Sequence, residues 1–219
     1  MKKIKAVIFD LDGTIADTID AIQHGINLTM KQLGYPESTR EDVVAHINNG
    51  ARQLIRLSLP EHLQSDEAKL NEALALYNEM YTKVYTETDT PYEGIPEVFA
   101  ELKARSYRLA ILSNKQDTFV PVLTEALLPK GSYAVARGQR PGAPTKPDPT
   151  VPLEIASILG AEPYECALVG DSNVDMITAK NAGMTAVGVS WGYRPVEVLL
   201  EAGADVIVHK PSELLKLFK

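Results

Sequence analysis

The feature that most constrains the fold of this chain is an alternation of short β-branched runs with longer helical patterns from residue 91 onward. Near-continuous apolar strands separated by helices are typical of a parallel sheet that helices cover on both faces. The predicted strands are Lys3–Phe9, Leu109–Leu112, Tyr133–Ala136, Ala167–Val169, Ala186–Val189 and Val206–Val208; the predicted helices between them are Pro96–Ser106, Thr118–Leu128, Thr150–Gly160, Val174–Gly183 and Pro195–Ala202. The sequence therefore predicts an α/β fold with a doubly wound parallel sheet.

Residues 17–89 interrupt this alternation and contain no predicted strand. Their apolar side chains recur at helical spacing, first at Ile22, Ile26, Met30 and Leu33 and again at Leu70, Leu74, Tyr77 and Tyr81. Ser65 is the predicted N-cap of the second of these helices. We expect a small all-helical domain, residues 17–89, inserted after the first strand as a lid. Residues 1–16 and 90–219 would then form the core domain.

Composition excludes several classes of protein. With 22 basic and 29 acidic side chains, the net charge of −7 argues against a nucleic-acid-binding surface. No stretch approaches the ~18 apolar residues of a membrane span. The single cysteine, Cys166, excludes an intrachain disulfide and fits a reducing compartment. The sequence thus predicts a soluble, cytoplasmic protein and does not indicate its oligomeric state.

The strongest chemical signal is Asp10-Leu-Asp12-Gly13-Thr14, directly after the first apolar strand. On a continuing strand, Asp10 and Asp12 would share one face at a separation of about 6.6 Å. Gly13 allows the chain to turn there, so both carboxylates can converge at the carboxyl end of the sheet, where α/β sheets bind their ligands. Two crowded carboxylates are costly unless a cation or a shared proton relieves them.

A second pair of carboxylates makes a cation the better explanation. Asp171 follows another strand and a glycine, and Asp175 comes one helical turn later, so both lie on one side of a starting helix. Either acid alone would suit a helix N-terminus. Two such clusters at strand ends favour an oxygen-ligated Mg²⁺.

Three further polar residues suit a phosphate group. Ser113 and Asn114 follow the strand Leu109–Leu112, and Lys146 lies between a threonine and a proline in a stiff segment. Each is an ordinary turn or surface residue when taken alone. Their order after the two aspartates is the specific signal.

These residues together resemble the haloacid dehalogenase superfamily of phosphatases, and the resemblance covers essentially the whole chain. The motifs that carry it are Asp10-x-Asp12-x-Thr14, Ser113, Lys146 and Gly170-Asp171-x-x-x-Asp175. Within this superfamily, Asn49-Gly50-Ala51, Ser113-Asn114-Lys115 and Gly188–Tyr193 are similar to phosphoglycolate phosphatases. The resemblance implies a Rossmann-like core with a helical cap after the first strand.

The resemblance also implies a mechanism. Asp10 would attack phosphorus and form an aspartyl-phosphate, and Asp12 would act as general acid and then base. Thr14 would hold Asp12 by a hydrogen bond. Mg²⁺ would be bound by Asp10, the carbonyl of Asp12, Asp171 and Asp175, the last directly or through water. The phosphoryl oxygens would be bound by Ser113, Asn114 and Lys146.

The helical domain would read the leaving group through residues 48–52. Gly50 permits close approach of the backbone, and the amides of Asn49 and Gly50 at the start of the following helix would receive an anion. Arg52 or Arg56 would clamp a carboxylate. Such a loop would suit a small phosphorylated acid, most simply 2-phosphoglycolate.

Three alternatives remain open at this stage. A phosphosugar phosphatase or mutase would share the same four motifs, and a phosphoacceptor signalling module also groups aspartates, a hydroxyl and a lysine on a parallel sheet. Gly188-Val-Ser190-Trp-Gly192 matches a serine-hydrolase elbow, with Asp205 and His209 following it. Asp205 and His209 bracket a strand, however, which would place them about 13 Å apart.

Overall fold

The computed structural model describes residues 3–86 and 90–219, which divide into two compact units. One unit consists of the chain up to Ala16 together with Pro91–Lys219, and the other of Asp17–Thr90. Residues 87–89 of the predicted insertion lie outside the described residues.

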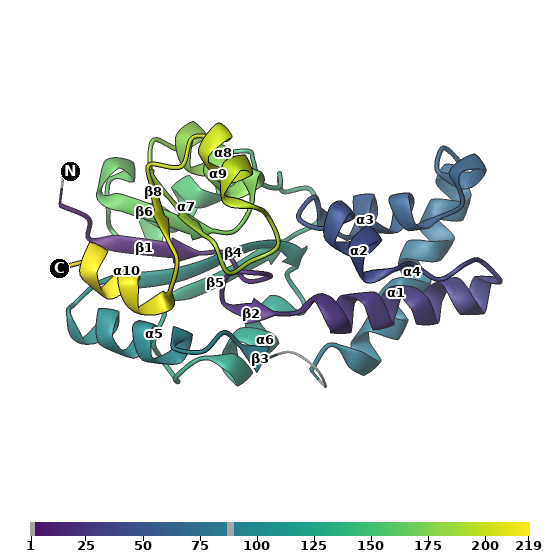
Figure 1. The fold of residues 1–219 in the computed structure, drawn as a ribbon, viewed down its shortest axis with the longest axis horizontal. Helices are drawn as coiled ribbons and strands as arrows, with labels where there is room; N and C mark the ends of the chain where they lie inside the picture. The colour runs from purple at the N-terminus through teal and green to yellow at the C-terminus, as the bar shows by residue number, and fades with distance from the viewer. Residues whose placement is uncertain (1–2, 87–89) are drawn as a thin grey trace. The chain divides into compact units, whose positions relative to one another are not determined.

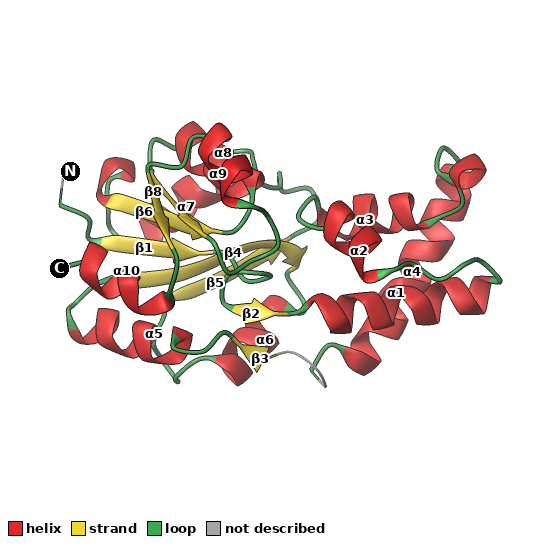
Figure 2. Ribbon diagram, in the orientation of Figure 1, coloured by secondary structure: helices red, strands yellow, loops and turns green. Residues whose placement is uncertain are grey.

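The larger unit is built on a parallel sheet (Figures 1 and 2). Within the described residues this sheet has six strands in the order β5-β4-β1-β6-β7-β8, and every recorded pairing is parallel. The strands are β1 (Ala6–Phe9), β4 (Arg108–Gln116), β5 (Val135–Gln139), β6 (Cys166–Gly170), β7 (Thr185–Val189) and β8 (Val206–Val208). The prediction of an α/β fold with a parallel sheet is confirmed.

Helices cover both faces of this sheet, as expected for a doubly wound fold. On one face lie α7 (Thr150–Ile158), α8 (Asn173–Asn181) and α9 (Val196–Glu201), and on the other lie α5 (Ile95–Ala104), α6 (Val120–Leu127) and α10 (Pro211–Leu217). Because successive strand residues point to opposite faces, Ala6 and Ile8 of β1 join the core cluster beneath α7, α8 and α9. Phe9 packs against Phe99 of α5 on the other face, with ring centroids 4.6 Å apart.

The structure differs from the predicted elements at several places in this unit. Strand β1 begins at Ala6 and not at Lys3. Helix α10 was not predicted. Strand β4 continues through the polar residues Ser113-Asn114-Lys115, which a hydropathy pattern does not mark as strand. Strand β5 begins two residues later than predicted and runs through Gly138, whose amide donates to Asp117 Oδ1 at 2.7 Å. A Cβ on Gly138 would lie 2.5 Å from the Lys115 carbonyl oxygen, so the close approach of the two segments requires glycine.

The smaller unit is helical. It contains α1 (Ile19–Leu33), α2 (Arg40–His46), α3 (Gly50–Ser58) and α4 (Glu67–Val84), with α1 packed on α4. Thr39 begins α2 with a capping box to Asp42. The predicted N-cap of α4, Ser65, is wrong by one residue, because the Asp66 carboxylate accepts the amides of Ala68 and Lys69.

Two short strands stand where the chain passes between the units. They are β2 (Ala16–Asp17) and β3 (Thr90–Pro91), which pair with one another. The expectation that no strand occurs in residues 17–89 is therefore wrong at Asp17. The described chain also has two 3₁₀ turns, Glu61–Leu63 and Pro163–Glu165.

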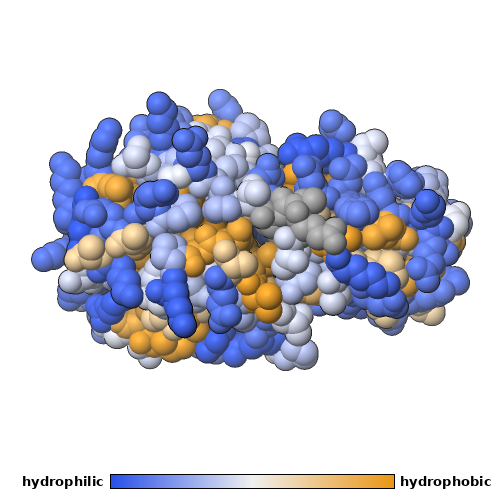
Figure 3. Space-filling view, turned by 90° about the horizontal axis from the view of Figure 1, so that it is seen from below, coloured by the Kyte–Doolittle hydropathy of each residue, from blue (hydrophilic) through white to orange (hydrophobic). Residues whose placement is uncertain are grey.

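Among the described residues, no helix is both long enough and apolar enough to cross a membrane. The face of the molecule in Figure 3 is largely hydrophilic, with apolar side chains gathered in separate patches.

Candidate active site

The site is formed where three neighbouring parallel strands end. Asp10 directly follows β1, Asp171 directly follows β6, and Ser113 lies toward the end of β4. Because β1 lies between β4 and β6 in the sheet, the carboxyl ends of these strands meet at one edge. Asp175 joins them from the first turn of α8.

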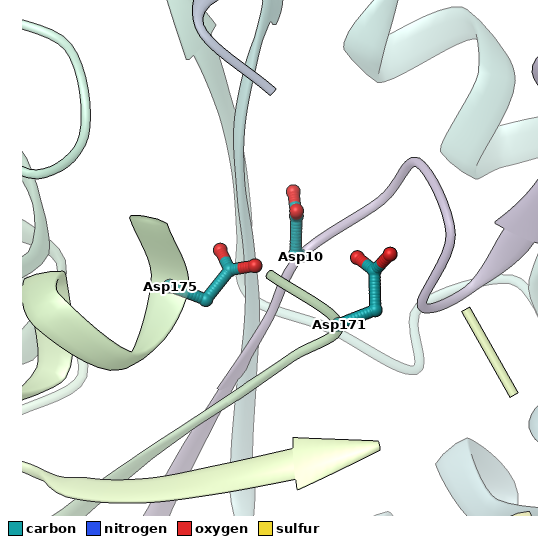
Figure 4. Close-up of side chains that lie close together, drawn as sticks. All are labelled: Asp10, Asp171 and Asp175. Carbon is teal, nitrogen blue, oxygen red and sulfur yellow. The ribbon is translucent and has the colours of Figure 1, made fainter. Parts of the chain in front are cut away.

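Asp10, Asp171 and Asp175 form a buried acidic cluster. One carboxylate oxygen from each lies within 4.8 Å of the other two, and Figure 4 shows the three carboxylates turned toward a common space. Asp10 is 4% exposed and the other two are fully buried. Buried carboxylates at this spacing are the ligand set that a hard divalent cation takes, so these three residues fit a metal site.

Two hydrogen bonds from Ser172 fix the Asp175 side chain. Its Oδ2 accepts from the Ser172 hydroxyl at 2.6 Å and from the Ser172 amide at 3.0 Å. The Asp175 amide donates to Ser172 Oγ at 3.3 Å, which completes a capping box at the start of α8. Gly170 leaves room for this arrangement, because a Cβ there would lie 2.5 Å from Asp175 Oδ2. Asp175 Oδ1 is turned to Lys146 instead, so this acid both caps a helix and faces the cluster.

Lys146 places its ammonium group inside the acidic cluster. Lys146 Nζ lies 2.9 Å from Asp10 Oδ1 and 2.6 Å from Asp175 Oδ1, and its side chain is 3% exposed. Asn114 holds the backbone of Lys146 at both polar atoms: its amide nitrogen donates to the Lys146 carbonyl at 3.0 Å, and its side-chain oxygen accepts the Lys146 amide at 2.9 Å. The structure thus shows Asn114 positioning the lysine, whereas its predicted contact with phosphate stays a prediction.

Asp12 lies outside the acidic cluster and pairs with Lys115. Lys115 Nζ is 2.7 Å from Asp12 Oδ1, and both side chains are nearly buried. The sequence predicts that the backbone carbonyl of Asp12 binds the metal. The side-chain carboxylate of Asp12 is therefore available to pair with Lys115. Sequence reasoning did not assign a role to Lys115, although strand periodicity places it on the same side of β4 as Ser113.

Thr14 and Ser113 are both buried at the site. The Thr14 hydroxyl donates to Asp171 Oδ1 at 3.2 Å. Its predicted hydrogen bond to Asp12 stays a prediction. The Ser113 hydroxyl accepts the amide of Lys115 at 3.1 Å, so the hydroxyl proton remains to be donated. The hydrogen bond between Thr14 and Asp171 therefore joins the segment after β1 to the segment after β6.

Burial governs the protonation of the acids. It raises the pKa of Asp10 well above its usual range, and the negative charge of Asp175 raises it further, while Lys146 opposes both effects. Burial and Asp175 raise the pKa of Asp171 to about 7. For Lys146, burial lowers the pKa, but the charges of Asp10 and Asp175 outweigh burial and raise it above its usual range.

The carboxylates at the site outnumber the lysine ammonium groups that contact them. Four buried carboxylates (Asp10, Asp12, Asp171 and Asp175) stand against the two ammonium groups that contact them. A divalent cation would compensate the remaining negative charge and favour the ionised acids.

The serine-hydrolase alternative is not supported by the contacts around Ser190. Its hydroxyl does lie 2.9 Å from His209 Nδ1. Asp205, however, binds Lys180 and the amide of Ala186, and α9 begins only at Val196. A triad needs an acid that orients the histidine ring and a helix directly after the serine, and neither is found in these residues.

The predicted leaving-group residues lie in the smaller unit. Asn49 is the N-cap of α3, and Gly50, at a φ of 81°, is its first residue. Arg52 therefore lies in the first turn of α3 and not in a loop, which corrects the prediction. Both Arg52 and Arg56 bind the carboxylate of Glu67 within this unit, and Arg52 also donates to Asn71.

Comparison with known proteins identifies the family. A sequence profile of the haloacid dehalogenase-like hydrolases matches residues 7–189. A phosphoglycolate phosphatase from Nitrosospira multiformis is 33% identical over 220 residues, which cover 99% of this chain and 96% of that protein. One from Chromobacterium violaceum is 29% identical over 221 residues, covering 100% and 98%.

Solved structures agree with this assignment. A haloacid dehalogenase-like hydrolase from Streptococcus pneumoniae superposes with a TM-score of 0.88 at 25% identity and covers 100% of both chains. A crystal structure from Lactobacillus delbrueckii subsp. bulgaricus gives a TM-score of 0.90 at 30% identity over 99% and 98% of the two chains. Together with the acids at the ends of β1 and β6, these likenesses establish that the chain belongs to the haloacid dehalogenase-like hydrolase family.

Proposed function

We propose that this protein is a Mg²⁺-dependent phosphatase that hydrolyses a small phosphomonoester, 2-phosphoglycolate, through an aspartyl-phosphate. The observation that carries the proposal is the gathering of four buried carboxylates at one edge of the sheet, where Lys115 pairs with Asp12 and Lys146 pairs with Asp10 and Asp175. The choice of substrate rests on full-length relatives at about 30% identity that are named phosphoglycolate phosphatases.

In the first chemical step, a carboxylate oxygen of Asp10 forms a bond to phosphorus while the bond between phosphorus and the leaving oxygen breaks. Asp12, in its protonated form, gives its proton to that oxygen and becomes the carboxylate that pairs with Lys115. In the second step, Asp12 takes a proton from water and the water oxygen bonds to phosphorus. The bond between the Asp10 oxygen and phosphorus breaks, which restores the Asp10 carboxylate and releases inorganic phosphate.

The remaining residues bind and orient. Lys146 neutralises negative charge beside Asp10, and Ser113 supplies a hydroxyl donor for a phosphoryl oxygen. Lys115 orients Asp12 through their ion pair. Mg²⁺, when bound by Asp10, Asp171, Asp175 and the Asp12 carbonyl, would neutralise charge on the phosphoryl group and the acids.

We assign the smaller unit, residues 17–89, as the cap that selects the leaving group. Gly50 and the amides at the start of α3 support this role, since α3 offers free amides for an anion. Arg52 supports it less, because its guanidinium already binds Glu67 and Asn71. The single buried, free thiol of Cys166 supports placement in the reducing cytoplasm.

The test is phosphate release by the purified protein with Mg²⁺ over a substrate panel. The panel contains 2-phosphoglycolate, a hexose 6-phosphate, a hexose 1-phosphate and p-nitrophenyl phosphate, with Asp10→Asn as the background. We expect kcat/KM for 2-phosphoglycolate to exceed that for either sugar phosphate by at least about 10-fold. Preference for a sugar phosphate, or its isomerisation without phosphate release, would replace this proposal with the phosphosugar phosphatase or mutase.

A further inference from the structure

The segment Ser190–Arg194, between β7 and α9, has no role in the steps described above. It nevertheless makes one hydrogen bond to the acidic cluster and one to Thr14, which itself binds Asp171. The indole nitrogen of Trp191 donates to the carbonyl of Thr14 at 3.1 Å, and the amide of Tyr193 donates to Asp171 Oδ2 at 2.8 Å. Both contacts are made within the larger unit.

These bonds and the chain from Trp191 to Tyr193 form a closed ring that includes Thr14 and Asp171. Trp191 holds the Thr14 carbonyl, the Thr14 hydroxyl donates to Asp171 Oδ1, and Tyr193 donates to Asp171 Oδ2. Each oxygen of a fully buried carboxylate is thereby fixed by a donor from a different loop. The plane of the Asp171 carboxylate is therefore set by the segment after β7 as much as by its own strand.

Gly192 forms the wall behind the same side chain. A Cβ on Gly192 would overlap the Asp171 Cβ, and it would lie 2.5 Å from both Asp171 Oδ2 and the Gly13 carbonyl oxygen. Gly13 is equally close to this carboxylate, because a Cβ there would overlap Asp171 Oδ2 and would lie 2.8 Å from the Tyr193 ring. Only glycine at both positions leaves room for the observed carboxylate.

We infer that Trp191, Gly192 and Tyr193 set the affinity for the divalent cation by holding Asp171 in its ligating orientation. They are positioning residues that act through Asp171. This inference rests on the proposed function, because it presupposes the metal. Residues that orient a metal ligand typically contribute 10- to 100-fold to metal affinity, and that range is the size of effect to test.

The experiment is titration of the metal-free protein with Mg²⁺ in a calorimeter. The variants are Gly192→Ala, which pushes against Asp171, and Trp191→Phe, which keeps an aromatic ring and removes the N–H donor. The matched control is Ser190→Ala, which loses the 2.9 Å bond to His209 in the same segment but touches neither Asp171 nor Thr14 in any recorded contact. We expect Mg²⁺ to bind at least 10-fold more weakly to Gly192→Ala, several-fold more weakly to Trp191→Phe, and within 2-fold of wild type to Ser190→Ala.

Melting curves in EDTA establish whether each variant is folded. If Gly192→Ala does not fold, the Mg²⁺ affinity of Trp191→Phe alone tests the inference. A purely structural role predicts lower melting temperatures with unchanged Mg²⁺ affinity, and that result would overturn the inference while the proposed function stands. A wild-type protein that binds no Mg²⁺ would overturn the metal site and the inference with it. Recovery of kcat by the variants at saturating Mg²⁺ would support the assignment further.

Discussion

The ammonium of Lys115 lies 2.7 Å from a carboxylate oxygen of Asp12, and both side chains are nearly buried. An ion pair so far out of water costs free energy to assemble, and removing one partner leaves the other charge uncompensated. The pair therefore ties the proposed general acid to β4, the same strand that carries Ser113.

Replacing Lys115 should damage turnover more than binding. We expect Lys115→Met to lower kcat with 2-phosphoglycolate by about 10²-fold, because Asp12 loses the group that orients it, and Lys115→Arg to restore part of the loss. The exposed Lys130→Met is the control. Steady-state kinetics with kcat for Lys115→Met within 2-fold of wild type would remove Lys115 from the mechanism.

Asp10→Asn should abolish phosphate release while the protein stays folded. An amide cannot form the acyl-phosphate, so we expect a loss of at least about 10³-fold in kcat. Mass spectrometry of acid-quenched wild-type protein should find a phosphoryl group on Asp10 during turnover. Substantial activity of Asp10→Asn would show that the nucleophile is another group.

Removal of the metal should inactivate the enzyme and lower its melting temperature at neutral pH. On the proposed function the acidic cluster binds a cation, and a ligand bound only by the folded state stabilises that state in proportion to the logarithm of the ligand concentration. Activity should return with Mg²⁺ but poorly with Ca²⁺, whose larger and looser coordination misplaces Asp10. Full activity in protein shown by elemental analysis to be metal-free would exclude this role.

Gly50 offers a test of leaving-group recognition. We expect Gly50→Val to reduce kcat/KM for 2-phosphoglycolate far more than for p-nitrophenyl phosphate, whose good leaving group depends less on the cap. Gly34→Val is a matched control, because Gly34 also lies in the smaller unit at a positive φ of 74° with open space around its Cα. Equal losses on both substrates in Gly50→Val would remove this residue from substrate recognition.

Cys166 provides a pH-dependent prediction away from the metal. Burial raises the pKa of its thiol to about 11, so at pH 8 the folded protein holds about 10²-fold less thiolate than an unfolded chain. Alkylation by iodoacetamide, followed by mass spectrometry, should be correspondingly slow until denaturant is added. Rapid alkylation of the folded protein would contradict the burial argument.

The raised pKa of Cys166 also determines how the stability of the folded protein changes with pH. The folded-state pKa lies above the unfolded-state value, so the unfolded chain loses its proton first as the pH rises. The contribution of Cys166 to stability is therefore lost between about pH 9 and pH 11. Between these pH values the melting temperature of the wild type should fall further than that of Cys166→Ala. Parallel plots of melting temperature against pH for the two proteins would contradict this prediction.

The sequence predicted the parts of the molecule that depend on local pattern. The parallel sheet, the helical insertion and the acids after β1 and β6 follow from hydrophobic periodicity and from strand ends, which a single segment reveals. The contacts from Lys115 to Asp12 and from Trp191 to Thr14 join residues 103 and 177 positions apart. No local pattern encodes such contacts, and for the same reason the bond from Thr14 to Asp171 was missed.

Smaller errors have local causes. Asp66 outcompeted Ser65 as the N-cap of α4, because both residue types cap well and the choice depends on where the helix begins. Gly50 and Arg52 were expected in a loop, yet α3 begins at Gly50, whose φ of 81° is a backbone conformation that glycine adopts without strain. Helix boundaries are set by such balances and not by hydrophobic pattern.

The order of the strands has a consequence for folding. Phe9 of β1 pairs with Ile111 of β4 and with Val169 of β6, so the central strand finds its neighbours only across very long stretches of chain. Such pairings are slow to form, whereas the contacts among α1 to α4 join segments that are closer together in the sequence. Asp10 can meet Asp171 only when β1 has paired with β6, so these two acids come together late in folding, and a refolding chain should regain helix well before it regains activity.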